Sequence, residues 1–106
     1  MTMHGNVRAM QYDSLYNLLY IGGDFRSVDG VHANNIACWD GTTWSTMNGG
    51  VNGTVRSMKL VGHDLYVGGY FQNAGGTSVS NIVKWDRTSW VSPGSGLPYI
   101  INNIEL

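Results

Sequence analysis

Leu-Tyr-Ile-Gly-Gly-Asp-Phe, at residues 19–25, returns 46 residues later as Leu-Tyr-Val-Gly-Gly-Tyr-Phe at residues 65–71. A second stretch repeats at the same offset, because Asn-Ile-Ala-Cys-Trp-Asp at 35–40 becomes Asn-Ile-Val-Lys-Trp-Asp at 81–86. All four tryptophans of the chain follow this spacing. Most of the 106-residue chain therefore consists of two copies of one sequence unit.

The size of the period indicates the fold class. Units of roughly 40–50 residues that consist of short apolar runs and glycine are typical of β-propeller blades rather than of helical repeats. We therefore predict an all-β fold with two four-stranded antiparallel blades and almost no helix. The first blade spans about 6–50 and the second about 54–96, and residues 100–106 repeat the first strand of a blade once more.

Each unit divides into four short runs that we expect to be strands. The first strands, 7–12 and 55–60, are 48 residues apart rather than 46, so the turn at 13–17 holds two extra residues. The later strands are expected at 18–25, 35–40 and 43–47, and again at 64–71, 81–86 and 89–92. Apolar residues occupy both faces of the second strands, as a sheet sandwiched between neighbours requires. The predicted core contains Leu19, Ile21, Phe25, Ile36, Trp39, Leu65, Val67, Phe71, Ile82 and Trp85.

A glycine doublet lies inside the second strand of each unit, at 22–23 and 68–69. Glycine weakens a strand, so its presence there marks a bend or the close approach of another backbone or ring. We expect a tryptophan ring to occupy this space.

These motifs resemble the Kelch repeat of galactose-oxidase-like propellers. The spelling Leu-Tyr-Val-Gly-Gly-x-Phe, followed by Asn-Ile-x-x-Trp-Asp and a second tryptophan, looks like the repeats of fungal cortical polarity-marker, bacterial surface and giant-virus proteins. The resemblance covers nearly the whole chain. It implies a rigid interaction platform at a cell surface, outside the cell or on a virion. The two units depart from each other where Asp24 becomes Tyr70, Asp29 becomes Gly75 and Gly41 becomes Arg87.

Composition argues against several classes of protein. The formal net charge is −1 and charged residues make up 12%, so no basic stripe is present to bind nucleic acid. Cys38 is the only cysteine, which excludes an intrachain disulfide and a cysteine-based metal site. No apolar run in the sequence approaches the length of a membrane span, and residues 1–6 lack the apolar core of a signal peptide.

Two repeated charges are candidate ligand contacts. Arg8 and Arg56 lie near the start of the first strands, which line the central channel in the family that the chain resembles. A ring of arginines would bind an anion. Alternatively, each arginine pairs with a nearby carboxylate or carbonyl, and Asn102 at the third corresponding position interrupts such a ring.

Other polar and aromatic positions carry weaker signals. Asp40 and Asp86 precede hairpins, where a carboxylate caps the turn more readily than it binds a hard cation. Tyr70 is a candidate partner contact, and Asn52-Gly53-Thr54 fits the N-glycosylation pattern. The histidines His4, His32 and His63 do not recur in the repeat and are expected in exposed turns. The tryptophans either stack on sugar rings or, as we favour, fill the space between blades.

The sequence favours a non-enzymatic structural or interaction module over an enzyme, because it shows no nucleophile motif, paired carboxylates or metal cluster. A lectin-like, carbohydrate-binding module is the alternative. No cofactor is predicted. The expected partners are another protein, a glycan, or further copies of the repeat, the last including a homo-oligomer.

Overall fold

The computed structural model describes residues 3–61, 63–79 and 81–91. These residues form strands and turns without any helix. The expectations for residues 92–96 and for the extra strand at 100–106, with Asn102, lie outside the described residues.

Two antiparallel sheets contain the main strands, and each follows the chain as a meander. The first sheet has the order β1 (Met3–Asp13), β2 (Leu18–Val28), β4 (Ile36–Trp39) and β5 (Trp44–Ser45), with β3 (Val31–His32) paired to β2. The second has the order β6 (Thr54–Val61), β7 (Asp64–Tyr70), β10 (Ile82–Trp85) and β11 (Trp90–Val91). A small hairpin of β8 (Asn73–Ala74) and β9 (Thr77–Ser78) completes the fold.

The all-β class and the antiparallel order of the strands are therefore confirmed. The strands β3, β8 and β9 were not predicted, because each is two residues long and none carries an alternating pattern. His4 and His32 lie in strands rather than in turns.

Corresponding strands pair in the same register within each of the two sheets. In the first, Tyr12 pairs with Leu19, Leu19 with Trp39, and Trp39 with Trp44. In the second, the same row across four strands consists of Leu60, Leu65, Trp85 and Trp90. Directly paired residues of a sheet point to the same face, so each row lies on one face of its sheet.

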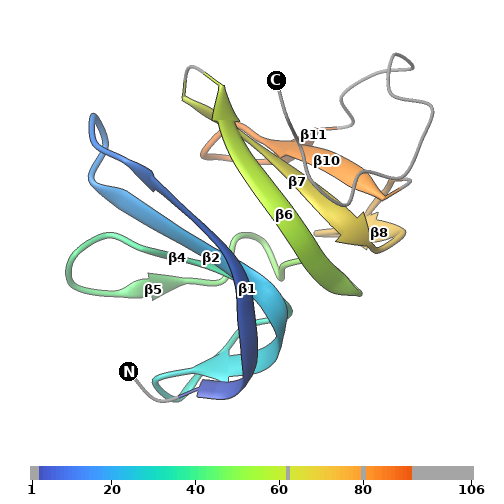
Figure 1. Ribbon diagram of the computed structural model, residues 1–106, viewed down its shortest axis with the longest axis horizontal. Coiled ribbons are helices and arrows are strands. Elements are labelled where there is room, and N and C mark those ends of the chain that lie inside the picture. Colours follow the sequence, from blue (N-terminus) through green and yellow to red (C-terminus); the bar gives the residue numbers. More distant parts are fainter. Residues whose placement is uncertain (1–2, 62, 80, 92–106) are drawn as a thin grey trace.

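One face of the first sheet packs against one face of the second. Figure 1 shows the first sheet on one side and the second on the other, with β1 and β6 adjacent between them. We call the packed face of the first sheet, which carries Tyr20, Ile36 and Cys38, its inner face; the opposite one is its outer face. Together with the row of Leu65, Trp85 and Trp90, the inner face forms the larger apolar core.

Eight of the ten predicted core residues are buried, and two are not. Leu19 and Trp39 are only partly buried, whereas their counterparts Leu65 and Trp85 are 0% and 7% exposed. Leu19 and Trp39 lie on the outer face of the first sheet, and Leu19 is at the margin of a smaller buried cluster of Ile21, Phe25, Val28, Ala33 and Ala37. No second sheet covers this face among the described residues.

At Gly22, Gly23 and Gly69 the nearest neighbours are residues of β1 and β6 and not a tryptophan ring, contrary to expectation. A Cβ atom at Gly23 would overlap the carbonyl oxygen of Asn6, and one at Gly69 would overlap that of Thr54. The pairing of β1 and β6 shifts register opposite the doublets, which brings these backbones close. A Cβ at Gly22 would instead lie 2.6 Å from Cγ1 of Val55, across the interface between the sheets.

A repeated asparagine closes the loop that follows each doublet. Asn35 and Asn81 have positive φ angles of 68° and 66°. The Asn35 N–H donates to the Phe25 carbonyl at 2.9 Å, and its own carbonyl accepts from Gly23 at 3.0 Å. The second unit repeats both hydrogen bonds at Asn81. Backbone hydrogen bonds thus join the Gly-Gly-x-Phe motif to the Asn-Ile motif in both units.

Candidate functional site

The repeated arginines each contact a residue on the neighbouring strand. Arg8 on β1 forms an ion pair with Asp24 on β2, with Nη2 and Oδ2 3.2 Å apart. Its hydrogen bond to the carboxylate lowers the pKa of Asp24 below the ordinary value. Arg56 on β6 lies over the ring of Tyr70, 5.3 Å from its centroid. The change from Asp24 to Tyr70 therefore replaces an ion pair by a cation–π contact at the same position of the unit.

Asp40 and Asp86 each cap the hairpin that they precede. Oδ1 of Asp40 accepts hydrogen bonds from the N–H groups of Thr42 and Thr43 at 2.9 and 2.8 Å. Asp86 does the same with Thr88 and Ser89 at 3.0 and 2.9 Å. These hydrogen bonds, backbone ones first, lower the pKa of each carboxyl to about 2. Both carboxylates are engaged as the turn interpretation expects, and each stays within its own hairpin.

Asn52, the predicted glycosylation acceptor, is exposed and ties two loops together. Its Oδ1 accepts from the N–H groups of Gln72 and Asn73 at 2.9 and 3.1 Å. Asn52 also lines a groove of about 540 Å³. The groove is bounded further by Asp24, Phe25, Arg26, Asn34, Asn35, Val51, Gly53 and Thr54.

The side-chain amides beside this groove are also engaged with backbone. Nδ2 of Asn34 donates to the carbonyl of Gly49 at 3.1 Å, and Nδ2 of Asn35 donates to that of Val51 at 2.9 Å. They hold the segment that leads from the first sheet to the second. The groove is therefore polar, and its amides serve the connection between the sheets.

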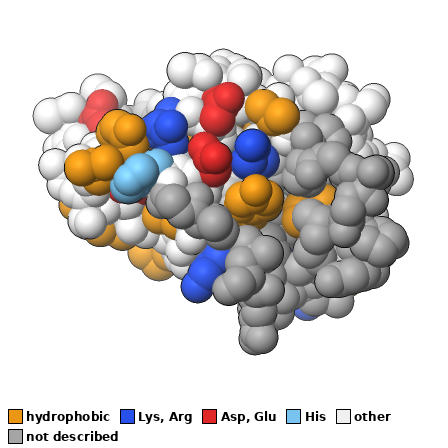
Figure 2. Space-filling view, turned by 90° about the horizontal axis from the view of Figure 1, so that it is seen from above, with side chains coloured by type: hydrophobic (Ala, Val, Ile, Leu, Met, Phe, Trp, Pro, Cys, Tyr) orange, Lys and Arg blue, Asp and Glu red, His pale blue; other side chains and the backbone are white. Residues whose placement is uncertain are grey.

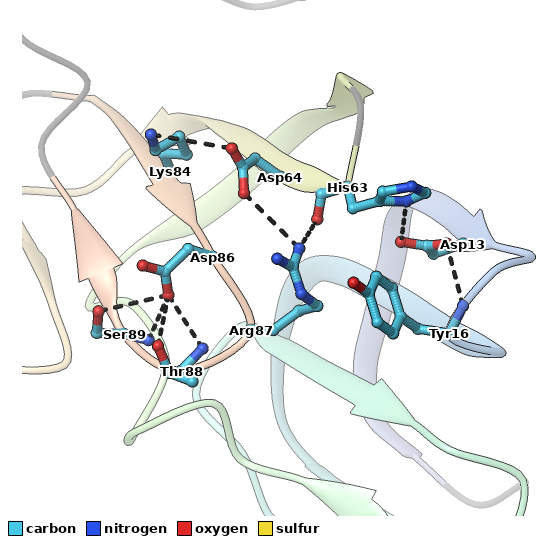
Figure 3. A network of polar contacts seen from close by, with 9 residues as sticks. All are labelled: Asp13, Tyr16, His63, Asp64, Lys84, Asp86, Arg87, Thr88 and Ser89. Carbon is cyan, nitrogen blue, oxygen red and sulfur yellow. Dashed lines mark hydrogen bonds and ion pairs between the residues drawn. The ribbon is translucent and has the colours of Figure 1, made fainter.

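A polar network joins the two sheets at the end that carries the β1–β2 and β6–β7 turns (Figure 3). Asp13 is 3% exposed, and its Oδ2 lies 3.2 Å from Nδ1 of His63 in the second sheet. The ring of Tyr16 meets the ring of His63 edge to face at 5.2 Å and lies 4.8 Å from the guanidinium of Arg87. Burial opposes the ionisation of Asp13. Hydrogen bonds from Tyr16, His63 and Leu15 nevertheless hold its pKa below the ordinary value.

Arg87 is the centre of this network. It donates to the carbonyl of His63, and its Nη1 lies 3.7 Å from Oδ1 of Asp64. Lys84 approaches the other oxygen of Asp64 at 4.0 Å. Figure 2 views the molecule from this end and shows acidic and basic side chains together, beside a histidine and hydrophobic side chains.

Sequence reasoning did not assign this network, although its signal was present. Tyr16 belongs to the turn with two extra residues, Arg87 replaces the Gly41 of the first unit, and His63 has no counterpart in the repeat. Three positions that break the repeat, Tyr16, His63 and Arg87, therefore meet at the junction of the two sheets. A comparison of the two units draws attention to the residues that they share, so it does not select residues that occur in one unit alone.

A cleft of about 440 Å³ lies on the outer face of the first sheet. Trp39 and Trp44 line it with ring centroids 5.1 Å apart, and the indole N–H of Trp44 donates to Oδ2 of Asp29 at 2.9 Å. Val31, Thr42 and Thr43 complete the lining. This cleft combines partly exposed aromatic surface with a carboxylate and two hydroxyls.

Comparison of the chain with protein-family models, with curated proteins and with solved structures gives no match. Within 3–61, 63–79 and 81–91, no helix is long and apolar enough to cross a membrane. The same residues contain no group of three or more His, Cys, Asp or Glu side chains that could hold a metal ion.

Proposed function

We propose that this chain is a non-enzymatic structural and interaction module, a segment of a Kelch-like β-propeller. The observation that carries the proposal is the face-to-face packing of two meanders, in which four strands of the first sheet correspond in order and in pairing to the four strands of the second. Blades of a propeller stack in this way, with apolar residues on both faces. Partners of such a module are further copies of the repeat or another protein that binds its turns.

Cooperative unfolding of the two sheets tests the scaffold. Cys38 is 6% exposed between the sheets, and burial raises the pKa of its thiol to about 11, so a thiol reagent reaches it only when the sheets separate. We expect Cys38 labelling and tryptophan fluorescence to report one denaturant transition. Two separate transitions would contradict a scaffold in which the sheets stabilise each other.

Substitution at the interface gives a second measure of the same property. Trp90→Ala removes a 6% exposed ring whose N–H donates to the carbonyl of Met47 in the first sheet at 2.7 Å. We expect a loss of about 3–5 kcal/mol in the free energy of unfolding. The adjacent Val91→Ala is the control, because Val91 is 36% exposed and its truncation should cost less than about 0.5 kcal/mol.

Carbohydrate binding is the second candidate, and the cleft at Trp39 and Trp44 favours it. Flat aromatic surface beside a carboxylate and hydroxyls suits a sugar ring. A glycan array probed with the wild type and with Trp44→Ala tests this function. Binding that is lost in Trp44→Ala would support a lectin, and the absence of binding would leave the scaffold as the function.

A further inference from the structure

The cleft at Trp39 and Trp44 has a counterpart in the second unit, which serves as an internal comparison. Trp85 and Trp90 form the corresponding pair, with ring centroids 4.8 Å apart against 5.1 Å in the cleft. Trp85 and Trp90 are 7% and 6% exposed, whereas Trp39 and Trp44 are partly exposed. A chemical difference that accompanies the exposed pair is therefore a candidate for ligand binding rather than for packing.

That difference is a carboxylate. Asp29 stands where the second unit has Gly75, and both residues have a positive φ, of 49° and 56°. A Cβ atom at Gly75 would lie 2.7 Å from Cδ1 of Trp90, so the buried pair leaves no room for a side chain there. In the first unit, Oδ2 of Asp29 accepts the N–H of Trp44 at 2.9 Å. Water satisfies an exposed N–H about as well, so this hydrogen bond alone does not account for a charged residue.

The hydroxyls of the cleft can only accept further hydrogen bonds. Oγ1 of Thr42 and Oγ1 of Thr43 donate to the carboxylate of Asp40 at 3.0 and 3.2 Å, and the N–H of Trp44 is already donated to Asp29. These side chains leave oxygen lone pairs and ring faces for a ligand, and both are electron-rich. Among the described residues that line the cleft, none is Lys, Arg or His. The lining therefore favours a ligand with a positive charge and several hydrogen-bond donors.

We propose that this cleft binds an amino sugar, whose ammonium group pairs with Asp29 while its ring packs on the indoles of Trp39 and Trp44. The proposal rests on the carbohydrate-binding candidate above and names its class of ligand. Hydroxyls of the sugar donate to Thr42 and Thr43. A lysine side chain of a partner protein would also pair with Asp29, but it has no hydroxyl to donate to the threonines.

Isothermal titration calorimetry of the full chain tests the class of ligand without any substitution. The probe is a short chitosan oligosaccharide, and its fully N-acetylated form is the matched control because it lacks the ammonium groups. In mildly acidic buffer, where the amines are protonated and carboxylates remain ionised, the chitosan form should bind at least about tenfold more tightly. Equal affinities would overturn the amino-sugar proposal and leave carbohydrate binding intact. Binding of neither form would overturn both and leave the scaffold function.

Asp29→Asn isolates the charge. Asparagine keeps an acceptor for the N–H of Trp44 and tolerates the positive φ, so the cleft should stay formed. Its affinity for the chitosan form should fall about tenfold, and its affinity for the N-acetylated form should stay as in the wild type. Asp24→Asn is the control, because it changes the net charge equally at a position outside the cleft. A preference for chitosan that survives in Asp29→Asn, or that falls equally in Asp24→Asn, would overturn the role of Asp29.

Two further measurements address the ring and the partner class. Chitosan should change the tryptophan fluorescence of the wild type, and binding should be lost in Trp44→Ala. Binding without a change in fluorescence would overturn the packing of the sugar on the indoles. An oligolysine peptide of matched charge should bind more weakly than chitosan, and tighter binding of the peptide would overturn the amino sugar in favour of a basic protein partner.

Discussion

At the scale of single residues, the repeat is maintained by backbone conformation as much as by burial. Asn35 and Asn81 hold the left-handed conformation at the start of the third strand of each unit, where a β-branched residue is strained. Arg87 also has a positive φ, of 81°, at a position where the first unit has Gly41. The chain accepts this strain at Arg87 together with the inter-sheet network that the arginine forms.

Asn81 offers a direct test of the backbone argument, because among the described residues its side chain has no hydrogen-bond partner, whereas that of Asn35 donates to Val51. Asn81→Val should lower the free energy of unfolding by about 1–2 kcal/mol. Asn81→Gly is the control and should be neutral within about 0.5 kcal/mol, since glycine adopts this conformation freely. Chemical denaturation measures both. Equal stability of the two variants would show that the conformation carries no strain.

At the scale of strands, the glycine doublets allow β1 and β6 to bulge toward their partners. Gly69→Val would drive a side chain into the backbone of β6, so we expect a loss of roughly 1–3 kcal/mol in unfolding free energy. Thermal unfolding of this variant beside Thr77→Val, at an exposed position of β9, makes the comparison. An unchanged melting temperature for Gly69→Val would show that the strands can separate there at no cost.

The capped hairpins predict a dependence on pH. A carboxyl whose pKa is lower in the folded state stabilises the fold above its unfolded pKa, and that stabilisation is lost as pH falls through the folded pKa. For Asp40 and Asp86 the window runs from about pH 4, the unfolded value, down to about pH 2. Carboxyl chemical shifts followed by NMR should give midpoints near 2 for both. In Asp40→Asn the midpoint of Asp86 should stay unchanged, and midpoints near the ordinary 3.8 would contradict the capping.

At the scale of the whole molecule, the inter-sheet network locks one sheet to the other. A double-mutant cycle of Arg87→Gly and Tyr16→Ala should give a coupling energy of about 0.5–1 kcal/mol, the usual strength of an exposed cation–π contact. Arg87→Gly relieves the positive φ at the same time, so the coupling is more informative than the single variant. Tyr70→Ala is the control partner, because Tyr70 contacts Arg56 and should show no coupling to Arg87.

The sequence by itself determined the period, the order of the strands, the antiparallel pairing and most of the core. These follow from local patterns: alternating apolar residues, Asp before each hairpin, and glycine where strands approach closely. The capping role of Asp40 was readable for the same reason, since its partners lie two and three residues away. The prediction that a tryptophan ring lies against the glycine doublets was wrong. The backbone of the neighbouring strand lies there instead, because that strand shifts register, and the shift has no signal in the sequence.

The tertiary structure alone decided which of two equivalent surfaces is buried. Trp39 and Trp85 share the motif Asn-Ile-x-x-Trp-Asp, and within the part of the chain that the structure describes only Trp85 has another sheet in front of it. Likewise, Asp13 and His63 are 50 residues apart and meet only because the sheets pack in one orientation. Burial and long-range contacts depend on which surfaces come together in space, and that information is not contained in the pattern of a single unit.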